Sequence, residues 1–123
     1  MTIQDEIFEK YRSASIGEPG AEIYIESEVA LCIPDDCENA NVAIIGVDTF
    51  TIILEATYPH LDGIADYSPR VQQPWDDFRR QCNSAAQKFM QEMQAEKGAN
   101  TYFSIVIIDV DEYENSLRRH RYF

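Results

Sequence analysis

Residues 42–57, VAIIGVDTFTIILEAT, combine β-branched and other apolar side chains at a density that is typical of strands. The residues from Gly46 to Thr49 interrupt the apolar run, so the stretch predicts two strands or one bent strand. We expect this stretch to form the centre of a sheet.

A long helix is predicted downstream, from Pro74 to about Lys97. Proline is favoured in the first turn of a helix, and Gly98 supplies a stop signal. Apolar side chains recur between these limits at steps of three and four residues, which places them on one helix face. The side chains expected on this face are Trp75, Phe78, Cys82, Ala85, Ala86, Phe89 and Met93.

The residues between the strands and this helix, 58–74, contain Pro59, Gly63, Pro69 and Pro74 among polar residues. Proline and glycine at this density favour turns over regular structure. We therefore expect an irregular surface loop of functional length.

The spacing of apolar residues predicts the secondary structure of the remaining segments. Thr2 and the apolar residues that follow predict an N-terminal helix that ends between Ser13 and Gly17. Residues 21–41 fit a strand or a helical turn, and Pro34 must interrupt either one. Residues 102–110 predict a strand, and the near-continuous apolar run at 105–108, IVII, predicts cover on both of its faces.

These elements predict an α/β or α+β fold, with a small central sheet on which the N-terminal helix and the long helix at 74–97 pack. The chain of 123 residues has the length of one domain, so we expect a single domain at 1–123. Residues 118–123, with three arginines, are expected to form a short basic C-terminal tail.

The charge of the chain excludes some classes of function. There are 22 acidic and 10 basic residues, which gives a net charge of −12. Such a chain is not expected to bind nucleic acid, because that affinity comes mainly from Lys and Arg. Residues 1–62 hold 13 acidic and two basic residues, so the negative charge is concentrated in the first half.

The compartment is inferred from the cysteines and from the lack of targeting signals. No stretch has the length of an apolar membrane span, and residues 1–10 are acidic where a signal peptide would be basic. Cys32, Cys37 and Cys82 are too few for a disulfide scaffold, so we expect reduced thiols, with Cys32 and Cys37 buried as small apolar residues. These features predict a cytoplasmic protein with no membrane partner.

The acidic residues come in local groups that would attract a basic protein, because clustered charge raises the association rate. Aromatic rings beside the acids favour an interface. We expect Tyr67 to be exposed there, whereas Trp75 is expected in the core. The candidate partner-binding residues are Asp35, Asp36, Glu38, Asp48, Glu55, Tyr58, Asp62, Asp66 and Tyr67.

Catalytic, metal and nucleotide sites have little support. The acidic groups lack the spacing of an EF-hand, the cysteines lack the paired spacing of a zinc site, and no glycine-rich phosphate loop occurs. His60 and His120 lie beside no recognisable nucleophile. We expect no cofactor, no metal and no enzymatic activity. Two alternatives stay open: a small enzyme with a carboxylate pair from Asp48, Glu55, Asp62 and Asp66, and a structural or adaptor subunit.

The segment NVAIIGVDTF at 41–50, followed by Glu55, Pro59, Asp62 and residues 66–68 (DYS), resembles bacterial polymorphic-toxin immunity proteins of the contact-dependent inhibition type. The resemblance covers about residues 30–75. Gly46, Asp48 and Phe50 match the strand-end pattern of these proteins, and Asp62 and Asp66 match their downstream acids. It implies a non-enzymatic inhibitor of a cognate protein toxin, and it leaves homo-oligomerisation open.

Overall fold

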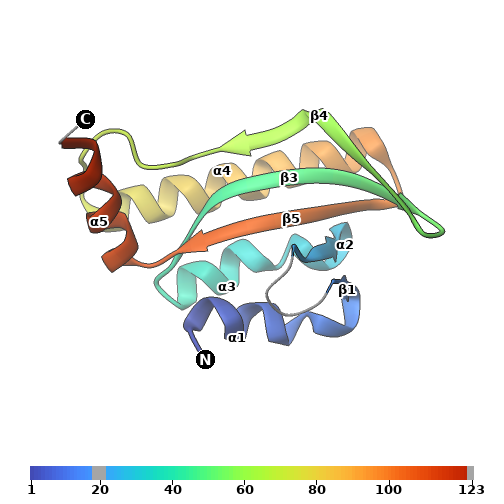
Figure 1. The fold of residues 1–123 in the computed structure, drawn as a ribbon, viewed down its shortest axis with the longest axis horizontal. Coiled ribbons are helices and arrows are strands. Elements are labelled where there is room, and N and C mark those ends of the chain that lie inside the picture. Colours follow the sequence, from blue (N-terminus) through green and yellow to red (C-terminus); the bar gives the residue numbers. More distant parts are fainter. Residues whose placement is uncertain (18–21, 122–123) are drawn as a thin grey trace.

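The computed structural model describes residues 1–17 and 22–121. Its centre is a five-stranded antiparallel sheet in the order β1-β2-β5-β3-β4 (Figure 1). The strands are β1 (Ser15–Ile16), β2 (Tyr24–Glu26), β3 (Ala43–Ile53), β4 (Ala56–Asp66) and β5 (Thr101–Ile108).

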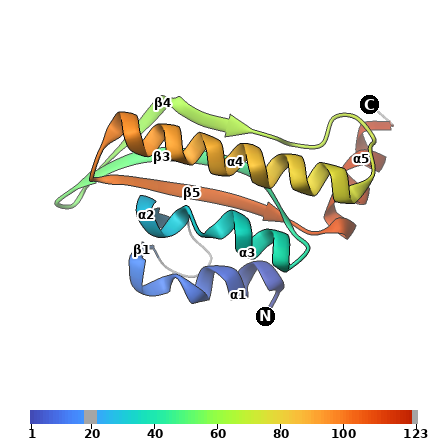
Figure 2. The same ribbon diagram turned by 180° about the vertical axis from the view of Figure 1, so that it is seen from behind.

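The helices are α1 (Ile3–Lys10), the 3-10 turn η1 (Arg12–Ala14), α2 (Ser27–Ala30), α3 (Ile33–Asn39), α4 (Trp75–Lys97) and α5 (Val110–Arg121). Those that cover the sheet lie on one face of it, whereas α1 lies beside α3 and α5 lies at one end of the sheet (Figure 1). Figure 2 shows α4 in front of the sheet with α2 and α3 beside it, whereas Figure 1 looks onto the opposite face, which no described helix crosses. The fold is therefore of the α+β class, with the N-terminal and long helices placed as predicted.

The two helices with strong local signals begin where the sequence predicts. Thr2 caps α1 through a capping box with Asp5, although α1 ends at Lys10, before the predicted limit, and η1 follows. Pro74 precedes α4, and Gly98 ends it with a φ of 89° that favours glycine. On the apolar face of α4, Phe78 is buried as expected. Met93 is also buried, while Trp75 and Phe89 pack at the border of the core.

The expectation that residues 105–108 are covered on both faces is wrong. Ile105 and Ile107 are buried against the helices, but Val106 between them is 54% exposed. The physical reason is that the helices lie on one face only, so alternate residues of β5 point to solvent.

Residues 43–66 form one hairpin, so the predicted loop at 58–74 is also wrong over most of its length. Strand β3 runs unbroken through the Gly46–Thr49 region, and β4 pairs with it up to Asp66, leaving an irregular segment at 67–74. Pro59 fits because β4 is an edge strand, where a missing N–H group is tolerated. Gly63 fits because a Cβ there would lie 2.5 Å from Cβ of Thr49.

Three further segments differ from expectation. Residues 24–39 form β2, α2 and α3 in succession, and Pro34 lies in the first turn of α3, where proline is tolerated. Residues 118–121 of the expected basic tail continue α5, and the last two residues of that tail lie outside the described part of the chain. This helix is held by Tyr113, whose ring lies 4.5 Å from that of Phe78.

The cysteines differ in exposure, which corrects the expectation that Cys32 is buried. Cys32 is exposed, whereas Cys37 and Cys82 are buried, and burial raises their pKa values to about 12 and about 11. We expect a thiol reagent at pH 8 to label Cys32 rapidly in the native protein and the other two only after unfolding. Rapid labelling of all three under native conditions would contradict the packing of α3 and α4.

Thr49 is the buried polar side chain with an unmet hydrogen bond. It is 1% exposed, and its hydroxyl has no hydrogen-bond partner among the described residues. We expect Thr49→Val to raise the free energy of unfolding by about 1 kcal/mol, because the variant no longer buries an unsatisfied group. Urea denaturation measures this change. The matched variant Thr51→Val should destabilise instead, because the Thr51 hydroxyl lies 2.7 Å from Nε2 of His60.

Candidate functional site

The uncovered face of the sheet is formed by alternate residues of four strands, and we call it the open face. Paired residues of neighbouring strands point to the same face, so the register defines three rows across the sheet. The rows are Glu26, Tyr102 and Phe50; then Ser104, Asp48 and Ile64; then Val106, Gly46 and Asp66.

Apolar and aromatic side chains are a large part of the open face. The rings of Tyr24 and Phe50 meet edge to face, with their centroids 4.9 Å apart, and Tyr102 is the direct partner of Phe50. Ile64 and Val106 are 56% and 54% exposed. Exposed apolar groups that gather on one face are typical of an interaction surface.

The formal charges on the open face are negative. The carboxylates of the open face are Glu26, Asp48 and Asp66. Glu22, which precedes β2 in the chain, lies near enough to Asp48 for its negative charge to raise the pKa of Asp48. None of the five strands contains Lys or Arg. Arg70 in the loop after β4 lies 3.6 Å from Asp66 at the border of the face.

Two of these carboxylates share a shallow hollow of about 290 Å³ that Ile64 and Val106 also line. Burial, with a smaller contribution from Glu22, raises the pKa of Asp48. Hydrogen bonds from the side chain and backbone of Ser68 lower the pKa of Asp66, and Arg70 adds to this effect. In the free protein, the surroundings therefore disfavour ionisation of Asp48 and favour ionisation of Asp66, which lines the same hollow.

The candidate acids on α3 lie away from the open face, and two of them have internal partners. Asp36 accepts hydrogen bonds from Nζ of Lys10, at 3.0 Å, and from the hydroxyl of Tyr11. Glu38 lies between α3 and α4, where it accepts from Asn83 and Arg79. Asp35 is exposed. Asp36 and Glu38 therefore tie α3 to its neighbouring helices.

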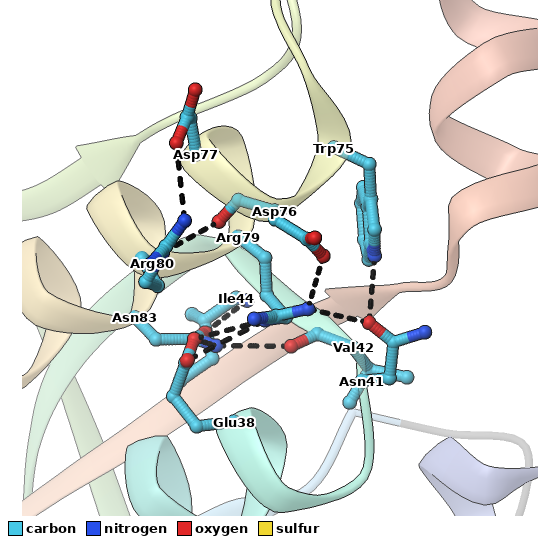
Figure 3. Close-up of polar contacts among 10 residues, drawn as sticks. All are labelled: Glu38, Asn41, Val42, Ile44, Trp75, Asp76, Asp77, Arg79, Arg80 and Asn83. Carbon is cyan, nitrogen blue, oxygen red and sulfur yellow. Dashed lines mark hydrogen bonds and ion pairs between the residues drawn. The ribbon is translucent and has the colours of Figure 1, made fainter.

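Figure 3 shows the polar network around Glu38. The amide of Asn83 donates to Oε1 of Glu38 at 2.7 Å and to the carbonyl of Val42 at 3.0 Å, and it accepts from the backbone N–H of Ile44 at 2.9 Å. Nε of Arg79 donates to Glu38 at 3.3 Å. These contacts join α3, β3 and α4, so we assign the network to the fold.

Three more side chains, those of Asn41, Trp75 and Asp76, extend this network on its outer side. Arg79 also donates to Oδ1 of Asn41 at 2.6 Å and to Asp76 at 2.8 Å, and the indole of Trp75 donates to Asn41 at 2.8 Å (Figure 3). Asn41 has a φ of 60°, a conformation that asparagine tolerates better than most residues. The sequence prediction missed Asn83, although a polar residue within the apolar stripe of α4 could have indicated it.

The remaining candidates are spread along the β3–β4 hairpin. Glu55 lies in the turn and Tyr58 is exposed near it, whereas Asp62 lies 2.9 Å from Nζ of Lys97 at the end of α4. Tyr67 is half-buried against the hydrophobic core, and burial raises its pKa, so the expected exposure is wrong.

Of the nine candidate residues, the structure brings Asp48 and Asp66 together on the open face. The sequence prediction missed Tyr24, Glu26, Phe50 and Tyr102 as members of the same surface. A tyrosine or glutamate in an undecided segment gives no signal of its own, because sheet register decides its neighbours.

The chain matches no protein-family model, no curated protein and no solved structure.

A second cavity of about 410 Å³ lies between the segment after β4 and α4. Its lining includes Arg70, Phe78, Gln81 and Cys82, with Asp66 at the border toward the open face. The Cys82 thiol points to the carbonyl of Tyr67, and its raised pKa makes it a poor nucleophile at neutral pH.

Within residues 1–17 and 22–118, whose side chains the structure describes, no three His, Cys, Asp or Glu side chains gather in a group that could hold a metal ion. None of the helices in that part of the chain has both the length and the apolar composition for crossing a bilayer.

Proposed function

We propose that this protein is an immunity protein that binds a cognate basic toxin of the nuclease type and neutralises it in the bacterial cytoplasm. The observation that carries the proposal is a sheet whose strands contain carboxylates and exposed apolar residues but no Lys or Arg. The resemblance of residues 41–50 to immunity proteins of polymorphic toxins supports the same function.

The physical argument is charge complementarity. An enzyme that cuts nucleic acid needs a basic cleft for the phosphates, and an inhibitor that occupies this cleft needs carboxylates in their place. The excess of acidic side chains that gives the net charge of −12 also causes electrostatic repulsion within the folded chain, and a cationic partner relieves that repulsion. In this proposal the chain binds its target without performing chemistry on it.

The test is co-expression with the product of the open reading frame immediately upstream. Wild-type protein should protect the cells, co-purify with that product as a stable complex, and block its cleavage of nucleic acid when the two are equimolar. The association rate should fall as salt is raised. Undiminished toxicity, together with no complex at low salt, would refute the immunity function.

A second candidate function is supported by the hollow that Asp48 and Asp66 share. Their pKa values are shifted in opposite directions, which is the arrangement of a general acid beside a general base. If the protein is an enzyme, Asp48→Asn and Asp66→Asn should each abolish turnover of a small molecule without unfolding the chain. Turnover that both variants retain would remove this pair from the chemistry.

A further inference from the structure

We propose that the open face is the docking surface, and that its occupant is a segment of a foreign protein in which cationic and apolar side chains are interleaved. The inference rests on the proposed function for the identity of that protein, and it goes beyond that function by choosing the surface and the chemistry of the contact.

The pattern of side chains across the open face determines what fits it. Each of its three rows contains one carboxylate, from Glu26, Asp48 or Asp66, and at least one apolar or aromatic side chain. A uniformly basic partner surface would leave the apolar groups of the open face exposed to water. A uniformly apolar partner surface would desolvate the carboxylates without pairing them with a cation. The matching surface alternates the two kinds of group.

Charge excludes the other occupants of a flat sheet face. A second copy of this chain would place like charges opposite each other, because the open face carries carboxylates while the strands carry no Lys or Arg. A nucleic acid or an anionic membrane would be repelled for the same reason. A cationic protein segment would bind favourably beside Asp48 in the middle row. Burial opposes ionisation of this carboxyl group, and a nearby cation stabilises its charged form.

The adjacent edge of the sheet is a poorer docking site than the face. Strand β4 is an outer strand, but the pairing to β3 shifts between the Phe50–Pro59 pair and the Asp48–Ile64 pair. Such an irregularity, together with a proline, prevents an added strand from pairing along the full edge. Contact through side chains on the face is therefore favoured over strand addition.

The test uses two synthetic peptides as probes, one alternating arginine with leucine and one alternating arginine with serine. Amide NMR shifts should change at open-face residues of β2, β3 and β5, and the leucine peptide should bind about tenfold more tightly because it also buries apolar area. Shift changes centred on α3 or on the 67–74 segment, or equal binding of the two peptides, would overturn the proposal.

Matched variants test the contribution of charge on each side of the molecule. Asp48→Asn should weaken binding of the leucine peptide about fivefold to tenfold, and Asp35→Asn, the same change at an exposed α3 position, should alter it less than about twofold. Asp48→Asn should fold at least as well as wild type, because burial opposes the charged form. Phe50→Ala tests the apolar part and should also weaken binding. Equal effects of the two Asn variants would refute the choice of face.

Co-expression with the upstream product separates this inference from the proposed function. If wild-type protein protects the cells, and Asp48→Lys loses this protection while Asp35→Lys retains it, both the docking surface and the immunity function are supported. Protection that Asp48→Lys fully retains would refute the docking surface and leave the immunity function intact. Peptide binding on the open face without any wild-type protection would refute the immunity function and leave the docking surface standing.

Discussion

Asn83→Ala is expected to lower the free energy of unfolding by about 3 to 5 kcal/mol, because it leaves several buried polar groups without partners. Asn83 is 2% exposed and bonds the N–H of Ile44, the carbonyl of Val42 and the carboxylate of Glu38. Water cannot readily reach the two backbone groups, because Val42 and Ile44 are themselves buried. Urea denaturation monitored by circular dichroism measures the loss.

The control for this variant is Ser84→Ala, at the exposed neighbouring position on α4, which should change stability by less than about 0.5 kcal/mol. A loss below about 1 kcal/mol for Asn83→Ala would mean that water or a backbone shift replaces the amide. The network around Glu38 would then not be what holds α3 to α4.

Phe103→Ala is expected to cost about 3 to 5 kcal/mol, whereas Val106→Ala on the same strand should cost less than about 1 kcal/mol. Phe103 is fully buried between the sheet and the helices, and Val106 is 54% exposed on the open face. The two variants together measure whether the core covers only one face of the sheet, because the two side chains point to opposite faces of β5. Thermal and urea unfolding of both variants give the comparison.

A cost for Val106→Ala close to that of Phe103→Ala would contradict an uncovered face. It would show that something buries Val106 in solution. Unfolding measured at several protein concentrations distinguishes self-association from intramolecular cover, because a dimer would make the stability depend on concentration.

The candidate site was only partly predictable. The sequence predicts Asp48 and Asp66 as partner-binding residues, and the structure places both on the open face. Asp36 and Glu38 gave the same sequence signal, an acid within an acidic group, yet they accept hydrogen bonds from residues far away in the chain. A carboxylate looks the same in sequence whether its cation lies within the protein or on a partner.

Local signals determined the parts of the fold that depend on a few neighbouring residues. Thr2 with Asp5 set the start of α1, and Pro74 with Gly98 set the limits of α4, because capping and backbone preferences act within one helical turn. The apolar stretch at 42–57 likewise predicted a strand, and β3 lies inside the sheet between β5 and β4, but the central strand is β5 and not the expected one.

Tertiary structure decided the features that depend on which strand lies beside which. Pro59 and Gly63 signal a loop in isolation, but an edge position and the close approach of Thr49 make them part of β4. Residues 105–108 are apolar whether one face of the sheet is covered or two. The open face joins residues from β2 to β5 that are separated by as many as 82 positions along the chain (24 and 106). Register creates this surface, and register depends on long-range pairing that no local pattern encodes.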